Sequence, residues 1–189
     1  MKYFLDCGSN LGQGFEHFRK IYGEDFQYKL FEPLTTCYDF LVEKYSDLEN
    51  VEIFNQAVYI ENCIKSFGCS ISDSLHVGGS LIENHNSSIQ NNTKQYYQVS
   101  CVDFIEFIDN IYNIGDEIIM KLDIESGEYD VLEKMIATGT IFKIKKIYCE
   151  FHSCYMSEND KTIFISRESN IINFMKTNHI NFIQWDETV

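Results

Sequence analysis

MKYFLDCGSNLGQG, residues 1–14, decides the fold of this chain. An apolar run ends at Asp6, a turn with two glycines follows, and apolar residues then recur at helical spacing. This order predicts a strand over residues 2–6, a tight turn, and a helix over residues 10–22. Glycine adopts positive φ and lets a ligand approach the backbone, so Gly8 and Gly12 suit a turn beneath a nucleotide-like cofactor.

Asn10, which lies between these two glycines, helps to distinguish one class of cofactor from another. A dinucleotide-binding turn has a second glycine where the pyrophosphate meets the backbone, and this chain has Asn10 near that point. An amide at this place suits the amino-acid end of S-adenosylmethionine better than a diphosphate. Because a glycine turn alone also occurs in strand–helix connections that bind nothing, the turn by itself leaves both interpretations open.

A second apolar run, residues 27–31, ends at Glu32 and Pro33. In nucleotide-binding βαβ units, an acidic residue about 20 positions after the glycine turn accepts hydrogen bonds from the ribose hydroxyls. Glu32 has this spacing from Gly12 and stands at the expected strand end. Pro33 cannot continue the strand and sharpens the turn. We therefore expect Glu32 to contact the ribose of the cofactor.

A charged motif, KLDIESGE, occupies residues 121–128 after an apolar run. Lys121, Asp123 and Glu125 stand at alternate positions, so they point to one side at the tip of the predicted strand. Glu150 and His152 repeat this spacing at the tip of the next predicted strand. Ligands of open α/β sheets bind outside such carboxyl ends, so these side chains are expected to share one pocket.

Three hypotheses for this cluster remain open. In the first, Lys121 neutralises Asp123 and the pair is purely structural. In the second, either Asp123 or His152 acts as a general base that removes a proton from a hydroxyl group. In the third, Asp123, Glu150 and His152 hold a divalent cation, and this donor set suits Mg²⁺ or Mn²⁺. The candidate catalytic residues are thus Lys121, Asp123 and His152. The remaining histidines are expected to be incidental, namely His17, His76, His85 and His179. Of these, His76 and His85 could join the site only through a lid.

The glycine turn, the Glu-Pro pair, residues 55–58 (NQAV) and above all KLDIESGE resemble the FkbM-type S-adenosylmethionine-dependent methyltransferases. The resemblance covers roughly residues 2–152. It implies a Rossmann-like three-layer α/β sandwich with a mostly parallel sheet and O-methylation of a sugar or similar hydroxyl. The cofactor-binding residues that it implies are Asp6, Gly8, Asn10, Gly12, Glu32, Pro33, Gln56 and Ala57. One departure is Ser126, where the family usually has glycine directly after the glutamate.

The remaining apolar periods predict a single domain over residues 1–189 in which strands and helices alternate. Residues 61–98 break the alternation and are expected to form one or two strands, a loop over residues 83–94, and a lid at residues 77–81. Class I methyltransferases have seven strands, the last antiparallel, whereas this chain ends near the sixth. Its sheet is therefore either shortened or completed by a strand from residues 61–98.

Composition excludes several partners and leaves two rival functions. A formal net charge of −14 argues against nucleic acids and anionic membranes as partners. The seven cysteines form no Cys-x-x-Cys pair, and the first residues do not resemble a signal peptide, so free thiols in the cytoplasm are expected. The expected acceptor is a hydroxyl group of a glycan, of a nucleotide sugar or of another small molecule. The rivals are an NAD-dependent oxidoreductase and a non-catalytic cofactor-binding partner domain.

Overall fold

The computed structural model describes residues 1–70, 78–85 and 94–185. Its elements are, in chain order, β1 (Lys2–Cys7), α1 (Gln13–Tyr22), β2 (Gln27–Phe31), α2 (Thr35–Tyr45), β3 (Val51–Phe54), β4 (Ala57–Tyr59), β5 (Cys63–Ser70), β6 (Lys94–Asp103), α3 (Phe104–Ile111), β7 (Glu117–Leu122), α4 (Glu128–Thr138), η2 (Thr140–Lys143), β8 (Ile144–Cys149), η3 (Ser153–Tyr155), α5 (Glu158–Thr177) and β9 (Phe182–Gln184). Within these parts of the chain, none of the helices has the length and apolar character that crossing a membrane requires.

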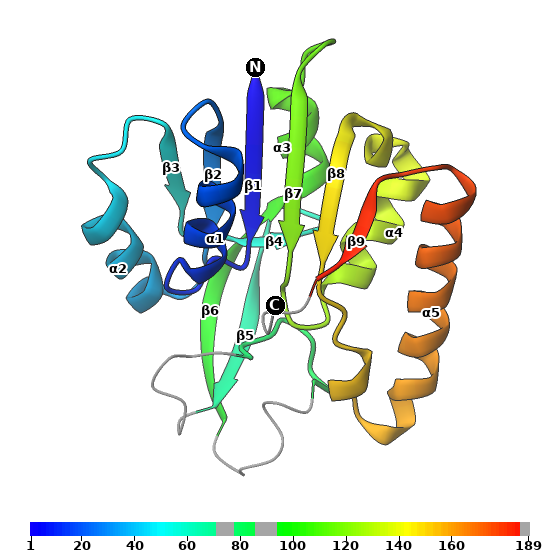
Figure 1. The fold of residues 1–189 in the computed structure, drawn as a ribbon. Helices are drawn as coiled ribbons and strands as arrows, with labels where there is room; N and C mark the ends of the chain where they lie inside the picture. Colours follow the sequence, from blue (N-terminus) through cyan, green and yellow to red (C-terminus); the bar gives the residue numbers. More distant parts are fainter. Residues whose placement is uncertain (71–77, 86–93, 186–189) are drawn as a thin grey trace.

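The main sheet has six strands in the order β3-β2-β1-β7-β8-β9, and every neighbouring pair is parallel. In Figure 1 these strands stand side by side with their arrowheads at the lower edge. The register places Asp6 beside Lys121 and Cys7 beside Phe31. The carboxyl ends of β1, β2 and β7 therefore lie level with one another at one edge of the sheet.

Helices cover both faces of this sheet because its strands alternate apolar side chains between the two faces. One face packs against α1 and α2 through Phe4, Ile119, Phe15, Phe18 and Leu41. The other packs against α3, α4 and α5 through Leu5, Met120, Ile108, Leu132 and Met175. This confirms the Rossmann-like three-layer α/β fold that the resemblance implied.

A second, three-stranded sheet, in the order β4-β6-β5, projects beyond the carboxyl ends of the main sheet (Figure 1). β5 and β6 are antiparallel, and β4 runs parallel to β6. One or two strands were expected within residues 61–98, and this range contains β5 and the start of β6. Of the expected lid, residues 78–81 are described and Val77 lies outside the described residues. Of the expected loop, residues 86–93 lie outside them as well.

Of the two alternatives expected for the main sheet, the described residues form the shortened one. β9 pairs in parallel with β8, and within the described residues no strand from residues 61–98 joins the main sheet, because β5 and β6 pair with each other. The helix expected to begin at Asn10 begins instead at Gln13. Asn10 has φ 45° and Gly12 has φ 90°, and this left-handed backbone cannot be part of a right-handed helix.

Candidate active site

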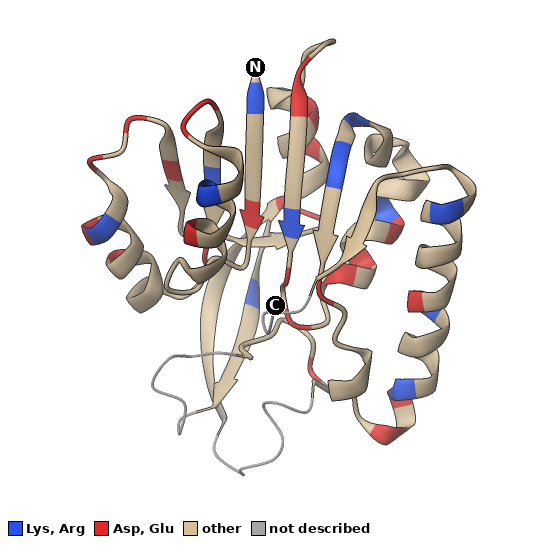
Figure 2. Cartoon of the chain, in the orientation of Figure 1, with Lys and Arg blue, Asp and Glu red and all other residues tan. Residues whose placement is uncertain are grey.

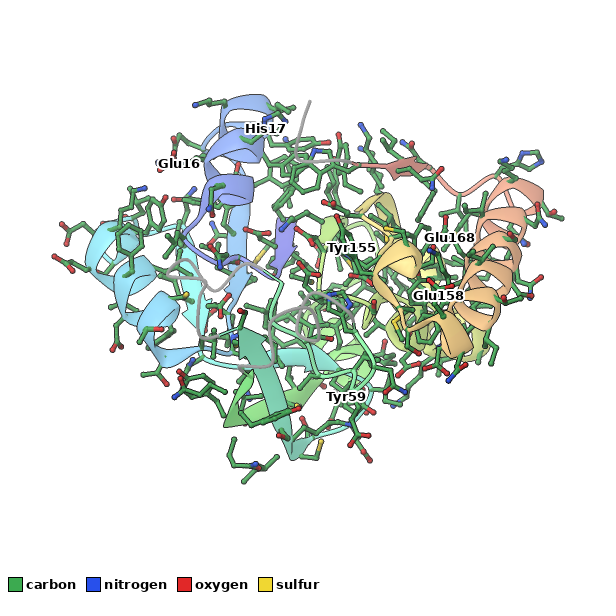
Figure 3. All side chains as sticks on the ribbon, turned by 90° about the horizontal axis from the view of Figure 1, so that it is seen from below. Glu16, His17, Tyr59, Tyr155, Glu158 and Glu168 are labelled. Atoms are coloured by element: carbon green, nitrogen blue, oxygen red, sulfur yellow. The ribbon has the colours of Figure 1, made fainter. Side chains whose placement is uncertain are left out.

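A cavity of about 470 Å³ opens at the carboxyl ends of the main sheet, between this edge and the second sheet. It lies beside β1 and β7, where the strand order reverses, which is the usual ligand position in open α/β sheets. Figure 3 views the molecule from this side, with Tyr155 of the lining and Tyr59 of the second sheet labelled. The volume of the cavity is in the range of small-molecule and cofactor sites.

The turn after β1 is held tightly against two other strand ends. The backbone N–H groups of Gly8 and Ser9 both donate to the carbonyl oxygen of Phe31, at 3.1 and 3.0 Å. Gly8 has φ 84°, and a Cβ atom there would lie 1.9 Å from the backbone oxygen of Asp123. Only glycine fits at this point. The turn that was expected to hold the cofactor therefore touches the turn that carries the acidic motif.

Glu32 supports this turn and faces the cavity. Its Oε2 accepts from the backbone N–H of Asn10 at 2.9 Å, and its Oε1 accepts from that of Leu34 at 2.8 Å. The side chain is buried, with 5% of the residue exposed. Burial raises the pKa of Glu32 to about 7, although the two backbone donors act in the opposite direction. Each carboxylate oxygen has a second lone pair, so Glu32 can still accept from a ligand hydroxyl.

The residues that the resemblance assigned to the cofactor divide into two groups. The cavity lining includes Gly8, Asn10, Glu32, Pro33 and Ala57. Asp6, Gly12 and Gln56 are not part of it. Asp6 is buried beneath Lys121, and a Cβ atom on Gly12 would meet the Tyr45 hydroxyl at 2.6 Å, so packing accounts for this glycine.

Lys121 joins the glycine turn to the acidic motif. Its Nζ donates to the backbone oxygen of Gly8 at 2.8 Å and lies 2.9 Å from Asp123 Oδ2 and 3.5 Å from Asp6 Oδ1. Lys121 is 1% exposed, so its charge is held almost entirely by these oxygens. A buried ammonium group in this position neutralises two carboxylates that would otherwise repel each other.

His152 lies among carboxylates on both sides of its ring. Nδ1 is 3.0 Å from Glu128 Oε1, while Nε2 is 3.6 Å from Asp123 Oδ1 and 3.7 Å from Glu125 Oε2. Burial alone would lower the pKa of His152, but these three carboxylates outweigh it and raise the pKa to about 10. At neutral pH the ring is therefore an imidazolium, which has no lone pair with which to accept a proton.

Glu128 is a member of the cluster that sequence reasoning did not select. It is fully buried at the start of α4, and its Oε1 also accepts from the backbone N–H of Ile124 at 2.7 Å. Within the described parts of the chain its Oε2 has no hydrogen-bond partner. One donor atom each from Asp123, Glu128 and His152 lie within 4.8 Å of one another. Glu150 is outside this group of three, with Oε1 3.9 Å from His152 Nε2.

His85, which was expected to reach the site only through a lid, also joins the cluster. Its ring is fully buried, with Nδ1 2.9 Å from Ser126 Oγ and Nε2 2.9 Å from Glu125 Oε2. These contacts link residues more than 40 positions apart in the chain, so no local sequence pattern could have indicated them. His17 and His179 are exposed elsewhere, and His76 lies outside the described residues.

The charge of the cavity is predominantly negative. Figure 2 shows acidic segments gathered after the carboxyl ends of β7 and β8, next to the basic tip of β7. The ionisable residues of the lining are Glu32, Asp123, Glu125, Glu150, Lys121 and His152. Both cationic groups are already paired with carboxylates, so the described lining offers an anionic ligand no free positive charge.

Comparisons with known proteins agree with this geometry. The family model of the methyltransferase FkbM domain matches residues 6–183, which span the glycine turn, Glu32, the acidic motif and His152. Searches of curated proteins and of solved structures returned no match. Because the family model matches most of the chain, this protein belongs to the FkbM methyltransferase family.

Proposed function

We propose that this methyltransferase transfers the methyl group of S-adenosylmethionine to a hydroxyl group of a small molecule such as a sugar. The observation that carries the proposal is the cavity in which Glu32 and the turn of Gly8 and Asn10 face Asp123 and its neighbours. Glu32 would accept from the ribose hydroxyls, and the turn would hold the amino-acid end of the cofactor. Both roles need only the atoms that already line the cavity.

The charge of the site supports this cofactor over NAD. S-adenosylmethionine has a sulfonium, an ammonium and one carboxylate, so it carries net positive charge, whereas the pyrophosphate gives NAD net negative charge. The acidic lining attracts the first and repels the second. Asn10 also stands where a dinucleotide turn has glycine.

We infer that Asp123 accepts the proton of the acceptor hydroxyl. S-adenosylmethionine, when bound, supplies an electrophilic methyl group, so the chain needs to align the hydroxyl, exclude water and remove its proton. Asp123 lines the cavity, and Lys121 fixes its Oδ2 at 2.9 Å. His152, as an imidazolium with Nε2 3.6 Å from Asp123 Oδ1, would stabilise the carboxylate rather than act as the base.

A divalent cation held by Asp123, Glu128 and His152 is the second version of this chemistry. It is favoured by one observation, namely that the buried Oε2 of Glu128 has no hydrogen-bond partner in the described parts of the chain. Two carboxylates and an imidazole suit Mg²⁺ or Mn²⁺, and such an ion would lower the pKa of a bound hydroxyl. In this version Glu128 is a ligand in place of Glu150, which was the expected one.

The acceptor is proposed to be uncharged. A phosphorylated or nucleotide-linked sugar would bring negative charge beside Asp123, Glu125 and Glu150, which favours a neutral sugar or similar alcohol and disfavours nucleic acids. All seven cysteines are present as thiols, and this supports a location in the reducing cytoplasm.

The test combines cofactor binding with turnover. Calorimetry should detect binding of S-adenosylhomocysteine and none of NAD, and a panel of neutral sugars should yield methylated product. Asp123→Asn should keep the binding and reduce turnover at least about 100-fold. Asp109→Asn, an exposed partner of Lys143, is the matched control.

Five results would each change or decide part of the proposal. NAD binding without S-adenosylhomocysteine binding would overturn the cofactor assignment. Binding without turnover of any acceptor would favour the non-catalytic partner domain. Loss of activity with chelator, restored by Mn²⁺, would select the cation version, and full activity in chelator would reject it. A parallel loss of melting temperature and activity in Asp123→Asn would make the cluster structural.

A further inference from the structure

The turn after β7 has an unusual backbone for the residues that occupy it. Glu125 has φ 54° and Ser126 has φ 75°, and neither is a glycine. Such a conformation strains an L side chain, and strain of this kind persists only where other contacts support it. Ser126 stands where the FkbM resemblance leads one to expect glycine, so its side chain requires an explanation of its own.

The hydroxyl of Ser126 connects two distant segments. Its Oγ lies 2.9 Å from His85 Nδ1 and donates to the backbone oxygen of His152 at 3.3 Å. The other ring nitrogen of His85 lies 2.9 Å from Glu125 Oε2. Serine and histidine together therefore fix both the backbone and the carboxylate of this turn. A glycine at position 126 would have no atom with which to contact His85.

His85 belongs to the segment of residues 78–85, part of which lines the cavity. Gly78, Gly79 and Leu81 line the cavity, and Ser80 Oγ donates to the backbone oxygen of Glu125 at 2.5 Å. At the far end of the segment, the backbone N–H of Ser157 donates to the oxygen of Asn84 at 3.0 Å. The segment is thus attached to the acidic turn at two places and to the residues before α5 at a third.

We propose that His85 and Ser126 are positioning residues that hold the segment of residues 78–85 and the Glu125 carboxylate in place for the acceptor. Glu125 lies between two histidines, with Oε2 2.9 Å from His85 Nε2 and 3.7 Å from His152 Nε2. Without His85, that carboxylate is free to turn toward His152 and change the charge around Asp123. The inference rests on the proposed function because it assigns the acceptor to this side of the cavity, opposite Glu32.

Isosteric variants separate the two contacts of His85. Asparagine keeps a polar atom near the position of Nδ1 and loses the contact with Glu125, whereas glutamine places its amide near the position of Nε2. Ser126→Gly removes the contact with His85 and relieves the left-handed backbone, so this variant retains its fold. His179→Asn is the control, because His179 is exposed and its φ of 55° suits asparagine.

Two measurements decide the proposal. The first is hydrogen exchange of the amides of Ser80 and His85 in the complex with S-adenosylhomocysteine. It should be at least about tenfold faster in His85→Asn, which loses the contact with Glu125, and in Ser126→Gly, which loses the contacts with both His85 and the backbone of His152. It should be intermediate in His85→Gln, which loses only the contact with Ser126, and unchanged in His179→Asn. The second is calorimetry, in which S-adenosylhomocysteine should bind all four variants within about threefold of the parent. With a sugar that the parent methylates, KM for that sugar should rise at least about fivefold in the first two variants only.

The outcomes distinguish this inference from the proposed function. Unchanged exchange in both His85→Asn and Ser126→Gly would overturn it and leave His85 a packing residue, whatever the cofactor. Faster exchange in His85→Gln to the same degree as in His85→Asn would also overturn it, because the contact with Glu125 would then contribute nothing. Failure of the parent protein to bind S-adenosylhomocysteine would overturn the proposed function, while the exchange rates of the unliganded proteins would still decide the role of the pair in holding the segment.

Discussion

Glu32 should make cofactor binding depend on pH and should release a proton when the cofactor binds. Burial raises the pKa of Glu32 from 4.5 to about 7, a difference that corresponds to about 3 kcal/mol. Because this pKa is raised, the contribution of Glu32 to stability is fully present below pH 4.5 and is lost as the pH rises through 7. A ribose hydroxyl donates to the ionised form, so binding must first remove the proton.

The expected size of the proton release and of the change in affinity follows from this pKa. At pH 6 about nine-tenths of the Glu32 side chains hold a proton, and at pH 8 about one-tenth do. Binding of S-adenosylhomocysteine should therefore release close to one proton at pH 6 and almost none at pH 8. Its affinity should rise roughly tenfold between these values and then level off. Calorimetry in buffers of different ionisation enthalpy measures both quantities.

Two variants make the result specific to this carboxylate. Glu32→Gln should bind about tenfold more weakly at pH 8 and release no proton at pH 6. Glu49→Gln, at an exposed position, should behave as the parent. If Glu32→Gln released as many protons as the parent, or bound equally well at pH 8, Glu32 would not be the ribose contact and this reasoning would be refuted.

Three further predictions follow from the same site and turn. Lys121→Met should lower the free energy of unfolding by about 3–5 kcal/mol, because it leaves the buried Asp6 and the partly buried Asp123 without their ammonium partner. Denaturant titration checks this, and a loss below about 1 kcal/mol would contradict it. Gly12→Ala should cost more stability than Gly115→Ala, since both glycines have φ near 90° but only Gly12 has a ring, that of Tyr45, in the position of the new Cβ; equal melting temperatures would show that the contact with Tyr45 is unimportant. The raised pKa of His152 contributes stability that is fully present below pH 6.5 and is lost as the pH rises through about 10, with a slope of up to about 1.4 kcal/mol per pH unit. His152→Gln should therefore make the free energy of unfolding depend less on pH over this range. An unchanged slope would show that His152 is not charged.

The sequence predicted the parts of the fold that depend on local patterns. β2 begins and ends at the expected residues, because its apolar run is closed by Glu32 and Pro33. The start of α1 was wrong, since positive φ at Asn10 does not follow from its identity. The second sheet was only outlined, because the pairing of β5 with β6 joins segments separated by a long irregular stretch.

For the site, spacing was sufficient for residues on strand tips and insufficient for the others. Lys121, Asp123 and His152 meet because parallel strands bring their carboxyl ends to one edge. Glu128 was missed as a neighbour of His152, because it lies on the first turn of α4 and faces the strand tips only after the chain reverses at Ser126. His85 was expected to be incidental unless a lid brought it to the site, and its partners were not predicted because they come from a turn whose backbone angles the sequence does not reveal.

The first strand of the chain occupies the middle of the main sheet, and this has a consequence for synthesis. β2 can pair with one edge of β1, and β3 with β2, soon after these strands leave the ribosome. The other edge of β1 has no partner until residues 117–122 have been made. Throughout that interval Tyr3, Phe4 and Leu5 present an open apolar edge, a template for pairing with other chains. Nascent chains that stop before β7 should therefore aggregate and depend on chaperones, whereas chains that have completed β7 should not.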